Sequence, residues 1–398
     1  MAGAFPGRIS LPTPVGEMAA FTLFESPIMA AELADKFPEI RTYAGQGVDD
    51  PTATLRLDIS PAGVHAQVLS ATSTFYIDPY FRGYDKFYAS YFPGDLKSRP
   101  IAETLLPSKS PSFSLAAPST TISSPLAVGA ELRKYDLALA ATAEYTQFHG
   151  GTVADGLNAI VTAVNRVNGI YERAVAVRFE LVAENDQLVY TDAALDPYTN
   201  NDADALADEN QQTVDSIVGA GNYDIGHVLS TGTSATAALG VVGVEGQKAK
   251  GVTGNPQPVG DAFLVDHLAH EIGHQFGANH TFNGLGGNCA NGSRNPDSAF
   301  EPGSGSTVFG YAGRCGDDDL QSNSDPYFHA SSFHEIVSYS TQGVGSAVAD
   351  VLATGNNVPQ VDGGADYVIP ADTAFALAAT GSDPDPGDVL TYSWEQMD

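Results

Sequence analysis

Basic residues are scarce in this chain, and long apolar runs are missing. Its 398 residues include 18 Lys and Arg against 48 Asp and Glu, which gives a formal net charge of −30 at pH 7. A protein this acidic repels a phosphate backbone and an anionic membrane surface, so we exclude nucleic acid as a partner. No stretch of 18 or more apolar residues occurs, and we therefore expect no membrane span.

Cysteine is nearly absent as well. The two cysteines, Cys289 and Cys315, flank a loop rich in glycine and asparagine. In an exported protein such a pair predicts a disulfide that closes the loop, and two free thiols are the alternative. The first residues, MAGAFPGRIS, lack a basic segment followed by an apolar one. Either a signal peptide lies upstream of this sequence or the protein is not secreted, and the family resemblance described below favours the first.

The most informative stretch present is HEIGHQFGANH, residues 270–280. On a helix His270 and His274 share one face, so both can bind one metal ion. Gly277 ends the helix and lets the chain turn, which brings His280 round as a third ligand. Glu271 lies beside them, where it can take a proton from water at the metal. Three protein nitrogens leave one position of a tetrahedral zinc open, as in catalytic sites.

The residues before the motif predict the helix that carries it. Asp261 is a candidate N-cap, and the segment after it contains no helix breaker. Apolar residues recur every four positions and form a stripe that points away from the two histidines. The stripe consists of Leu264, Leu268, Ile272 and Phe276.

The motif HExxHxxGxxH resembles the zinc signature of the metzincin metallopeptidases, and a wider stretch resembles a bacterial reprolysin-like (M12B-like) family. That stretch runs from about Glu131 to Leu352 and includes the segments ELRKYDLALAATAEY, NRVNGIYER, VTGNPQPVGD, GANHTFNG and YAGRCGDDDLQSNSDPYFH. The resemblance implies a twisted mixed sheet, an active-site helix and an irregular lower subdomain. It also implies that His270, His274 and His280 bind zinc and that Glu271 is the general base.

One residue departs from the family pattern. Metzincins carry a methionine in a tight turn beneath the metal, and none of the four methionines here lies in a matching place. Phe309, in the segment 306–311, stands where that methionine would be. Because phenylalanine is also large and apolar, we expect metal binding to persist with altered stability. Tyr311 matches a tyrosine near the zinc in related subfamilies and is a candidate oxyanion donor, with a core tyrosine as the alternative.

The flanks of the catalytic stretch divide the chain into further units. Residues 1–96 alternate like β-strands and resemble the family's pro-region, an intramolecular inhibitor. Residues 97–130 are rich in Ser, Pro, Thr and Ala, as expected of a linker with the activation cleavage. Lys97, Arg99 and Lys109 are candidate cleavage points there, or ordinary solubilising residues.

The catalytic domain, residues 131–355, predicts alternating strands and helices and hence an α/β (α+β) fold with a mixed sheet. We expect strands over 135–143, 175–182 and 223–229, and helices over 152–168 and 202–218. The short apolar segment Gly240–Val244 is our candidate for the edge strand that accepts the substrate backbone. Residues 356–398 resemble the start of an Ig-like or PKD-like β-sandwich module.

Other polar residues are weaker candidates. His65, or an aspartate or glutamate of the N-terminal region, could block the zinc, whereas no cysteine upstream can do so. The acidic residues Asp317, Asp318, Asp319 and Asp325, and further on Asp383, Asp385 and Asp388, are candidate calcium ligands or solvated loops.

Together these features predict a secreted, monomeric zinc metalloendopeptidase in its zymogen form, acting on proteins or peptides. The alternative is a catalytically silent zinc-binding adhesion module of the same fold, for which the missing methionine is the motive. A zinc hydrolase acting on amides other than peptides has no positive support in the sequence.

Overall fold

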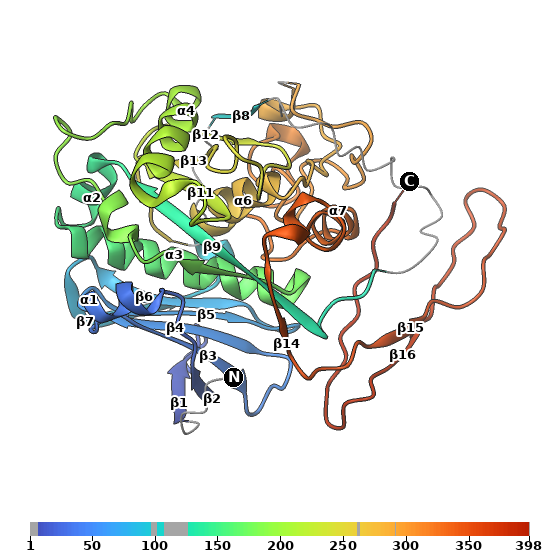
Figure 1. Ribbon diagram of the computed structural model, residues 1–398. Helices are drawn as coiled ribbons and strands as arrows, with labels where there is room; N and C mark the ends of the chain where they lie inside the picture. The colour runs from blue at the N-terminus through green and yellow to red at the C-terminus, as the bar shows by residue number, and fades with distance from the viewer. Residues whose placement is uncertain (1–6, 97–101, 107–125, 261–262, 291, 398) are drawn as a thin grey trace.

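The computed structural model describes residues 7–96, 102–106, 126–260, 263–290 and 292–397 (Figure 1). Two sheets form its framework, and the long helix α3 (Val153–Val175) lies between them. Lys97, Arg99, Lys109 and Asp261 lie outside the described residues.

The first sheet is an antiparallel meander whose seven strands follow chain order. Alternating apolar residues such as Phe21, Leu55 and Val68 point to one face and are buried there. The strands are β1 (Gly7–Pro12), β2 (Met18–Glu25), β3 (Arg41–Gly47), β4 (Thr54–Ser60), β5 (Gly63–Leu69), β6 (Phe75–Phe81) and β7 (Tyr84–Tyr91), with α1 (Ala31–Lys36) between β2 and β3. This arrangement confirms the predicted β-rich character of the N-terminal region.

The second sheet is mixed, as predicted. Its order is β10-β9-β11-β13-β12-β8, and β14 pairs with the start of β9. The strands are β8 (Ala102–Leu106), β9 (Glu131–Ala141), β10 (Val177–Leu181), β11 (Ile225–Ser230), β12 (Ser234–Ala238), β13 (Gly251–Gly254) and β14 (Asp350–Ala353). The strands from β10 to β13 run parallel, whereas β12 is antiparallel to β13.

Two helices connect the parallel strands. Helix α3 joins β9 to β10, and α4 (Ala203–Val214), with a π-helical extension over Asp215–Gly219, precedes β11. Thr152 and Asp155 form a reciprocal capping box that starts α3. The helix runs seven residues past the predicted end at position 168, because its apolar stripe continues through Ile170 and Tyr171 to Val175.

The N-terminal sheet and the catalytic region share apolar packing across α3. Ile28, Met29 and Leu33 belong to the same buried cluster as Val164 and Val167 of α3. The backbone between β2 and α1 also extends the mixed sheet, since Leu181 N donates to Ile28 O at 2.8 Å. The two sheets are therefore joined by a common core.

The predicted edge strand was wrong in position. Residues 240–244 form turns, and Gly240 N and Val241 N donate to His274 O and Gln275 O at 2.9 and 2.8 Å. These bonds satisfy two carbonyls at the C-terminal end of helix α6 (His270–Gln275), so the segment packs against that end of the helix. The strand that flanks the site is β12, and β8 pairs with it in parallel.

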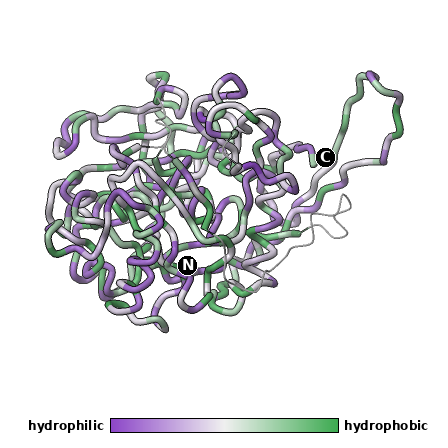
Figure 2. The backbone as a smooth tube through the Cα atoms, turned by 90° about the horizontal axis from the view of Figure 1, so that it is seen from above, coloured by the Kyte–Doolittle hydropathy of each residue, from purple (hydrophilic) through white to green (hydrophobic). Residues whose placement is uncertain are grey.

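The remaining elements comprise one helix in the first half of the chain and three elements near its C-terminal end. They are α2 (Ala143–His149), which lies before α3, and α7 (Ala330–Thr341), β15 (Gln360–Asp362) and β16 (Thr380–Ser382). β15 and β16 form a two-stranded ribbon that extends away from the body of the molecule (Figures 1 and 2). Among the helices in the described part of the chain, none is long and apolar enough to cross a membrane.

Candidate metal centre

The active-site helix has two parts. A π-helical segment, Leu264–Ala269, leads directly into α6 (His270–Gln275). The predicted apolar stripe is buried throughout, from Leu264 to Phe276. Gly277 then adopts a φ of +89°, and its N–H donates to His274 O at 2.8 Å, which ends the helix as predicted.

The three predicted histidines converge on one point. The Nε2 atoms of His270 and His274 lie 2.9 Å apart, and His280 Nε2 lies 3.2 and 3.1 Å from them. All three side chains are buried, with at most 1 % of each exposed. The structure thus brings together the three residues that the motif placed on a helix and in the turn after it.

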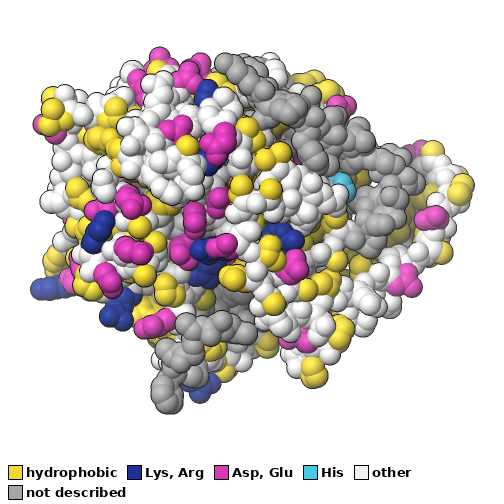
Figure 3. Space-filling view, in the orientation of Figure 1, with side chains coloured by type: hydrophobic (Ala, Val, Ile, Leu, Met, Phe, Trp, Pro, Cys, Tyr) yellow, Lys and Arg dark blue, Asp and Glu magenta, His cyan; other side chains and the backbone are white. Residues whose placement is uncertain are grey.

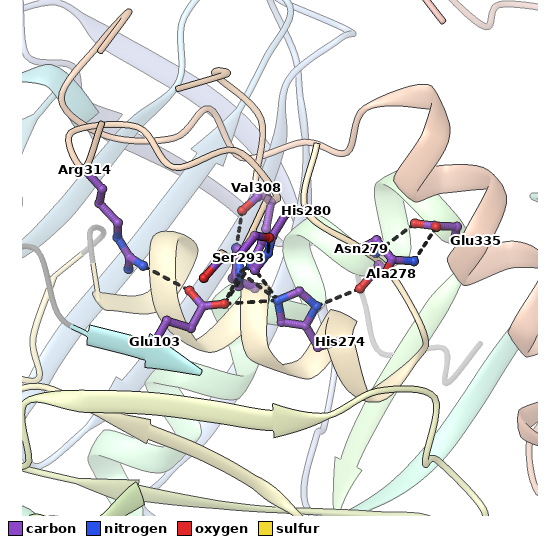
Figure 4. A network of polar contacts seen from close by, with 10 residues as sticks. Glu103, His274, Ala278, Asn279, His280, Ser293, Val308, Arg314 and Glu335 are labelled. Carbon is purple, nitrogen blue, oxygen red and sulfur yellow. Dashed lines mark hydrogen bonds and ion pairs between the residues drawn. The ribbon is translucent and has the colours of Figure 1, made fainter. Parts of the chain in front are cut away.

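Backbone carbonyls fix the tautomer of each imidazole. The Nδ1 atoms of His270, His274 and His280 donate to Val308 O, Ala278 O and Ser293 O at 2.6, 2.7 and 2.8 Å (Figure 4). Because a carbonyl oxygen can only accept, each neutral ring carries its proton on Nδ1. Three Nε2 lone pairs therefore face one another, an arrangement that a cation stabilises.

The spacing of these nitrogens fits zinc. Ligands about 2.0–2.1 Å from a tetrahedral zinc lie about 3.3 Å from one another, close to the observed separations. Three neutral imidazoles are also a ligand set that zinc accepts in catalytic sites. His270, His274 and His280 would therefore hold the ion.

A fourth ligand atom comes from a strand far away in the sequence. Glu103 of β8 places Oε1 3.1, 3.3 and 2.8 Å from the Nε2 atoms of His270, His274 and His280. Its Oε2 accepts a hydrogen bond from Arg314 at 3.0 Å (Figure 4). Burial acts to raise the pKa of Glu103, but the neighbouring His270 and His280 hold it well below its usual range.

Sequence reasoning did not single out Glu103. It allowed an acidic residue of the N-terminal region to block the metal, but it could not choose among the many carboxylates there. His65, the named alternative, lies 3.1 Å from Asp58 in the first sheet, and no described metal-binding group contains it. The only signal in the sequence is a glutamate in a short strand-like segment that otherwise reads as a linker.

Glu271 is buried beside the triad. Burial and the charge of Glu103 raise the pKa of Glu271 well above its usual range, while Arg314 acts in the opposite direction. Its Oε2 atom has no hydrogen-bond partner among the described residues. A carboxyl group in such surroundings binds a proton readily, as a general base must.

Phe309 forms the apolar floor of the site. Its ring centroid lies 5.0 and 5.3 Å from those of His270 and His274, and the side chain is fully buried. Gly273 makes room for it, because a Cβ there would collide with the Phe309 ring. The predicted substitute for the missing methionine therefore occupies the expected place. Tyr311 packs against His280, with ring centroids 4.7 Å apart.

Glu301 organises the turn that carries Phe309, a role that the sequence did not reveal. Its carboxylate accepts from Ser306 N and Thr307 N at 2.7 and 3.1 Å, and from Thr281 Oγ1 at 2.5 Å. Thr281 directly follows the third histidine. One carboxylate thus links the metal-binding turn to the floor beneath it.

Glu335 of α7 fixes the turn that leads to the third histidine. It accepts from Asn279 N at 2.9 Å and from Asn279 Nδ2 at 2.7 Å (Figure 4). Burial raises the pKa of Glu335 to about 7, against the effect of these hydrogen bonds. The contact holds the backbone between Gly277 and His280 in one conformation.

The predicted disulfide is present, with the Cα atoms of Cys289 and Cys315 5.1 Å apart. It lies next to Arg314, the partner of Glu103. Two of the candidate calcium ligands nearby bind backbone amides instead: Asp318 accepts from Leu285 N and Gly286 N, and Asp319 from Cys315 N. Oxygens of Asp383, Asp385 and Asp388 do gather within 4.8 Å of one another, and calcium there stays a prediction.

A mixed β-sheet connected by helices, an active-site helix and a buried triad of metal-binding histidines define a metallopeptidase. Residues 132–340 match the family described as metallo-peptidase family M12B, reprolysin-like. The match covers more than half of the chain, and the protein belongs to this family. A search of curated proteins found no significant match.

Proposed function

We propose that this chain is the zymogen of a secreted zinc endopeptidase, with Glu271 as its general base. One observation carries the proposal: Glu271 is buried on the same helix turn as two of three histidines whose lone pairs converge. When bound, zinc supplies Lewis acidity, which polarises a carbonyl and lowers the pKa of water toward about 7.

Residues of the chain supply proton transfer, stabilisation of the oxyanion and binding of the substrate. Glu271 takes a proton from the attacking water and then delivers it to the leaving amine. Its raised pKa suits it to holding that proton between the two steps. Tyr311, beside His280, is positioned to stabilise the oxyanion. β12 lies at the site and can accept an extended peptide as an added strand, which favours protein substrates.

Export is the expectation that the disulfide and the acidic composition support. Disulfides persist in oxidising compartments, and Cys289–Cys315 closes a loop at the metal centre. In this proposal the N-terminal sheet with β8 is the pro-region, and cleavage in the linker releases the site.

The first test is Glu271→Gln. We expect the variant to bind one zinc per chain, measured by elemental analysis, and to lose cleavage of an unfolded protein by about 10²–10⁴-fold after nicking of the linker. The matched control is the exposed Glu17→Gln, which should cleave like the wild type.

Zinc binding without any cleavage that depends on Glu271 would contradict the proposal and favour the silent adhesion module. Cleavage of simple amides but not of peptides would favour the hydrolase of other amides.

A further inference from the structure

The position of β8 blocks the face of the site where a substrate would bind. β8 pairs with β12 from Ala102↔Ser234 to Leu106↔Ala238, so the edge of the sheet is occupied along its whole length. Glu103 is paired with Ala235 in this register, and its side chain is 2 % exposed. The same strand therefore covers the edge and delivers a carboxylate to the histidines.

The carboxylate cannot be held there by hydrogen bonds from the histidines. Each Nδ1 proton is donated to a backbone carbonyl, so each neutral Nε2 presents a lone pair to Glu103 Oε1. Oxygen and nitrogen lone pairs about 3 Å apart repel unless a cation lies between them. Glu103 Oε1 and the three Nε2 atoms form six pairs, whose separations range from 2.8 to 3.3 Å. Ligand atoms of a tetrahedral zinc site lie about 3.3 Å from one another, so these separations are close to that value.

Arg314 explains why this carboxylate takes a single position. Its guanidinium binds Oε2 at 3.0 Å, and its side chain is 4 % exposed. The other oxygen is thereby turned toward the histidines. Arg314 is next to Cys315, so the disulfide anchors the backbone from which it extends.

We propose that Glu103 is the fourth ligand of the metal in the intact chain, held by Arg314 as a positioning residue, and that the site opens only when β8 leaves β12. This inference rests on the proposed function for its biological meaning, but the ligand set can be measured without catalysis. Four protein ligands close a tetrahedral site, whereas a catalytic site keeps one position for water.

The test uses the full chain in the Glu271→Gln background, loaded with Co²⁺, so that self-cleavage cannot confuse the result. Adding Glu103→Gln should change the visible absorption of the cobalt. It should also tighten the binding of acetohydroxamate, a small metal-binding probe, by at least about tenfold, because the competing ligand is gone. Arg314→Met should give a smaller shift in the same direction. The exposed Glu17→Gln is the control and should change neither property.

A wild-type measurement keeps the test valid if the variants fold poorly. Relaxation of water protons by the Co²⁺ form should be weak in the intact chain and stronger after the linker is nicked, because only an open position binds exchanging water. Strong relaxation in the intact chain, or an unchanged spectrum and unchanged hydroxamate affinity in Glu103→Gln, would overturn the inference. Absence of peptide cleavage by the nicked, zinc-loaded wild type, with these spectral changes intact, would instead count against the proposed function alone.

Discussion

Gly273 is the residue that fits Phe309 beneath the metal. A Cβ at this position would collide with the Phe309 ring and lie 2.9 Å from Tyr171 Oη. In an ordinary helix, Gly→Ala stabilises by roughly 0.5–1 kcal/mol. Here we expect Gly273→Ala to destabilise by about 1–3 kcal/mol through overpacking, measured by urea unfolding of the zinc-loaded chain.

The control is Gly273→Ala made in a Phe309→Ala background, where the ring is absent. Phe309→Ala alone should cost about 3–5 kcal/mol, and Gly273→Ala added to it should cost nothing or stabilise slightly. Equal effects of Gly273→Ala in both backgrounds would show that the ring and the glycine are not coupled.

The buried Asp266 should make the free energy of unfolding depend on pH. It lies one turn before His270, where burial raises its pKa to about 7 although Ser324 N donates to it at 2.8 Å. The folded chain therefore keeps a proton that the unfolded chain loses near pH 4. Since the folded state binds more protons at this site, the contribution of Asp266 to the free energy of unfolding falls as the pH rises from about 4 to 7, by up to about 4 kcal/mol.

Asp266→Asn should remove this contribution, so that its unfolding free energy changes less than that of the wild type over the same pH range. Urea titrations at pH 4.5, 6 and 7.5 would measure it. Asp297→Asn, at an exposed position, is the control. Parallel curves for the wild type and Asp266→Asn would refute the assignment.

Sequence reasoning identified the local part of the site but not the distant part. His270, Glu271, His274 and His280 lie within eleven residues, so helix periodicity and one glycine turn determine their geometry. Glu103 and Arg314 come together only because β8 pairs with β12. That pairing depends on tertiary packing, which no local pattern encodes.

At the scale of elements, α3 carries charged contacts to the N-terminal sheet. Arg166 Nη2 donates to Asp78 Oδ1 at 2.6 Å and to Ala66 O at 3.3 Å, and Arg56 forms an ion pair with Glu172. Both arginines are at most 7 % exposed. Removing one partner of a buried pair leaves an uncompensated charge.

We therefore expect Asp78→Ala to destabilise the chain by about 3–5 kcal/mol in urea unfolding. Asp85→Ala, on the exposed strand β7, should have little effect. The interaction also depends on pH. Burial acts to raise the pKa of Asp78, but Arg166, His65 and Tyr91 outweigh it and lower the pKa.

A lowered carboxyl pKa stabilises the fold above the ordinary value near 3.8 and stops doing so as the pH falls through the folded value. The difference between the wild type and Asp78→Ala should therefore be full at pH 6 and should shrink below about pH 4. A difference that stays constant at low pH would exclude the ion pair as its source.

The elements were predicted best where their pattern is long and periodic. Helix α3 and strands β9, β10 and β11 lie where the sequence indicated them, within a few residues except at the end of α3. The edge strand was misplaced because Gly240–Val244 and Ser234–Ala238 are both five-residue segments rich in small residues, and periodicity cannot decide between such short segments.

At the scale of the whole molecule, the sequence led us to expect a succession of separate units and gave no sign of the contact between them. The shared core through Ile28, Met29 and Leu33 depends on residues that are ordinary in composition and far from α3 in the chain. The segment 102–106, read as linker, forms a strand of the catalytic sheet. Composition indicates whether a segment is ordered by itself, but it does not reveal that the segment forms a strand by pairing with a neighbouring sheet edge.

The pairing of β8 with the edge of β12 affects whether copies of the enzyme associate with one another. Once β8 departs, the outward-facing amides and carbonyls of residues 234–238 form a template on which a second copy could pair and aggregate. Acidic side chains are spread over the face of the molecule seen in Figure 3, and the net charge of −30 makes approaching copies repel. The screening length falls from about 10 Å in 0.1 M salt to about 3 Å in 1 M salt, so the repulsion between copies weakens at high salt concentration. In the proposed activation, the acidity of the chain would oppose association between copies whose sheet edge has become exposed.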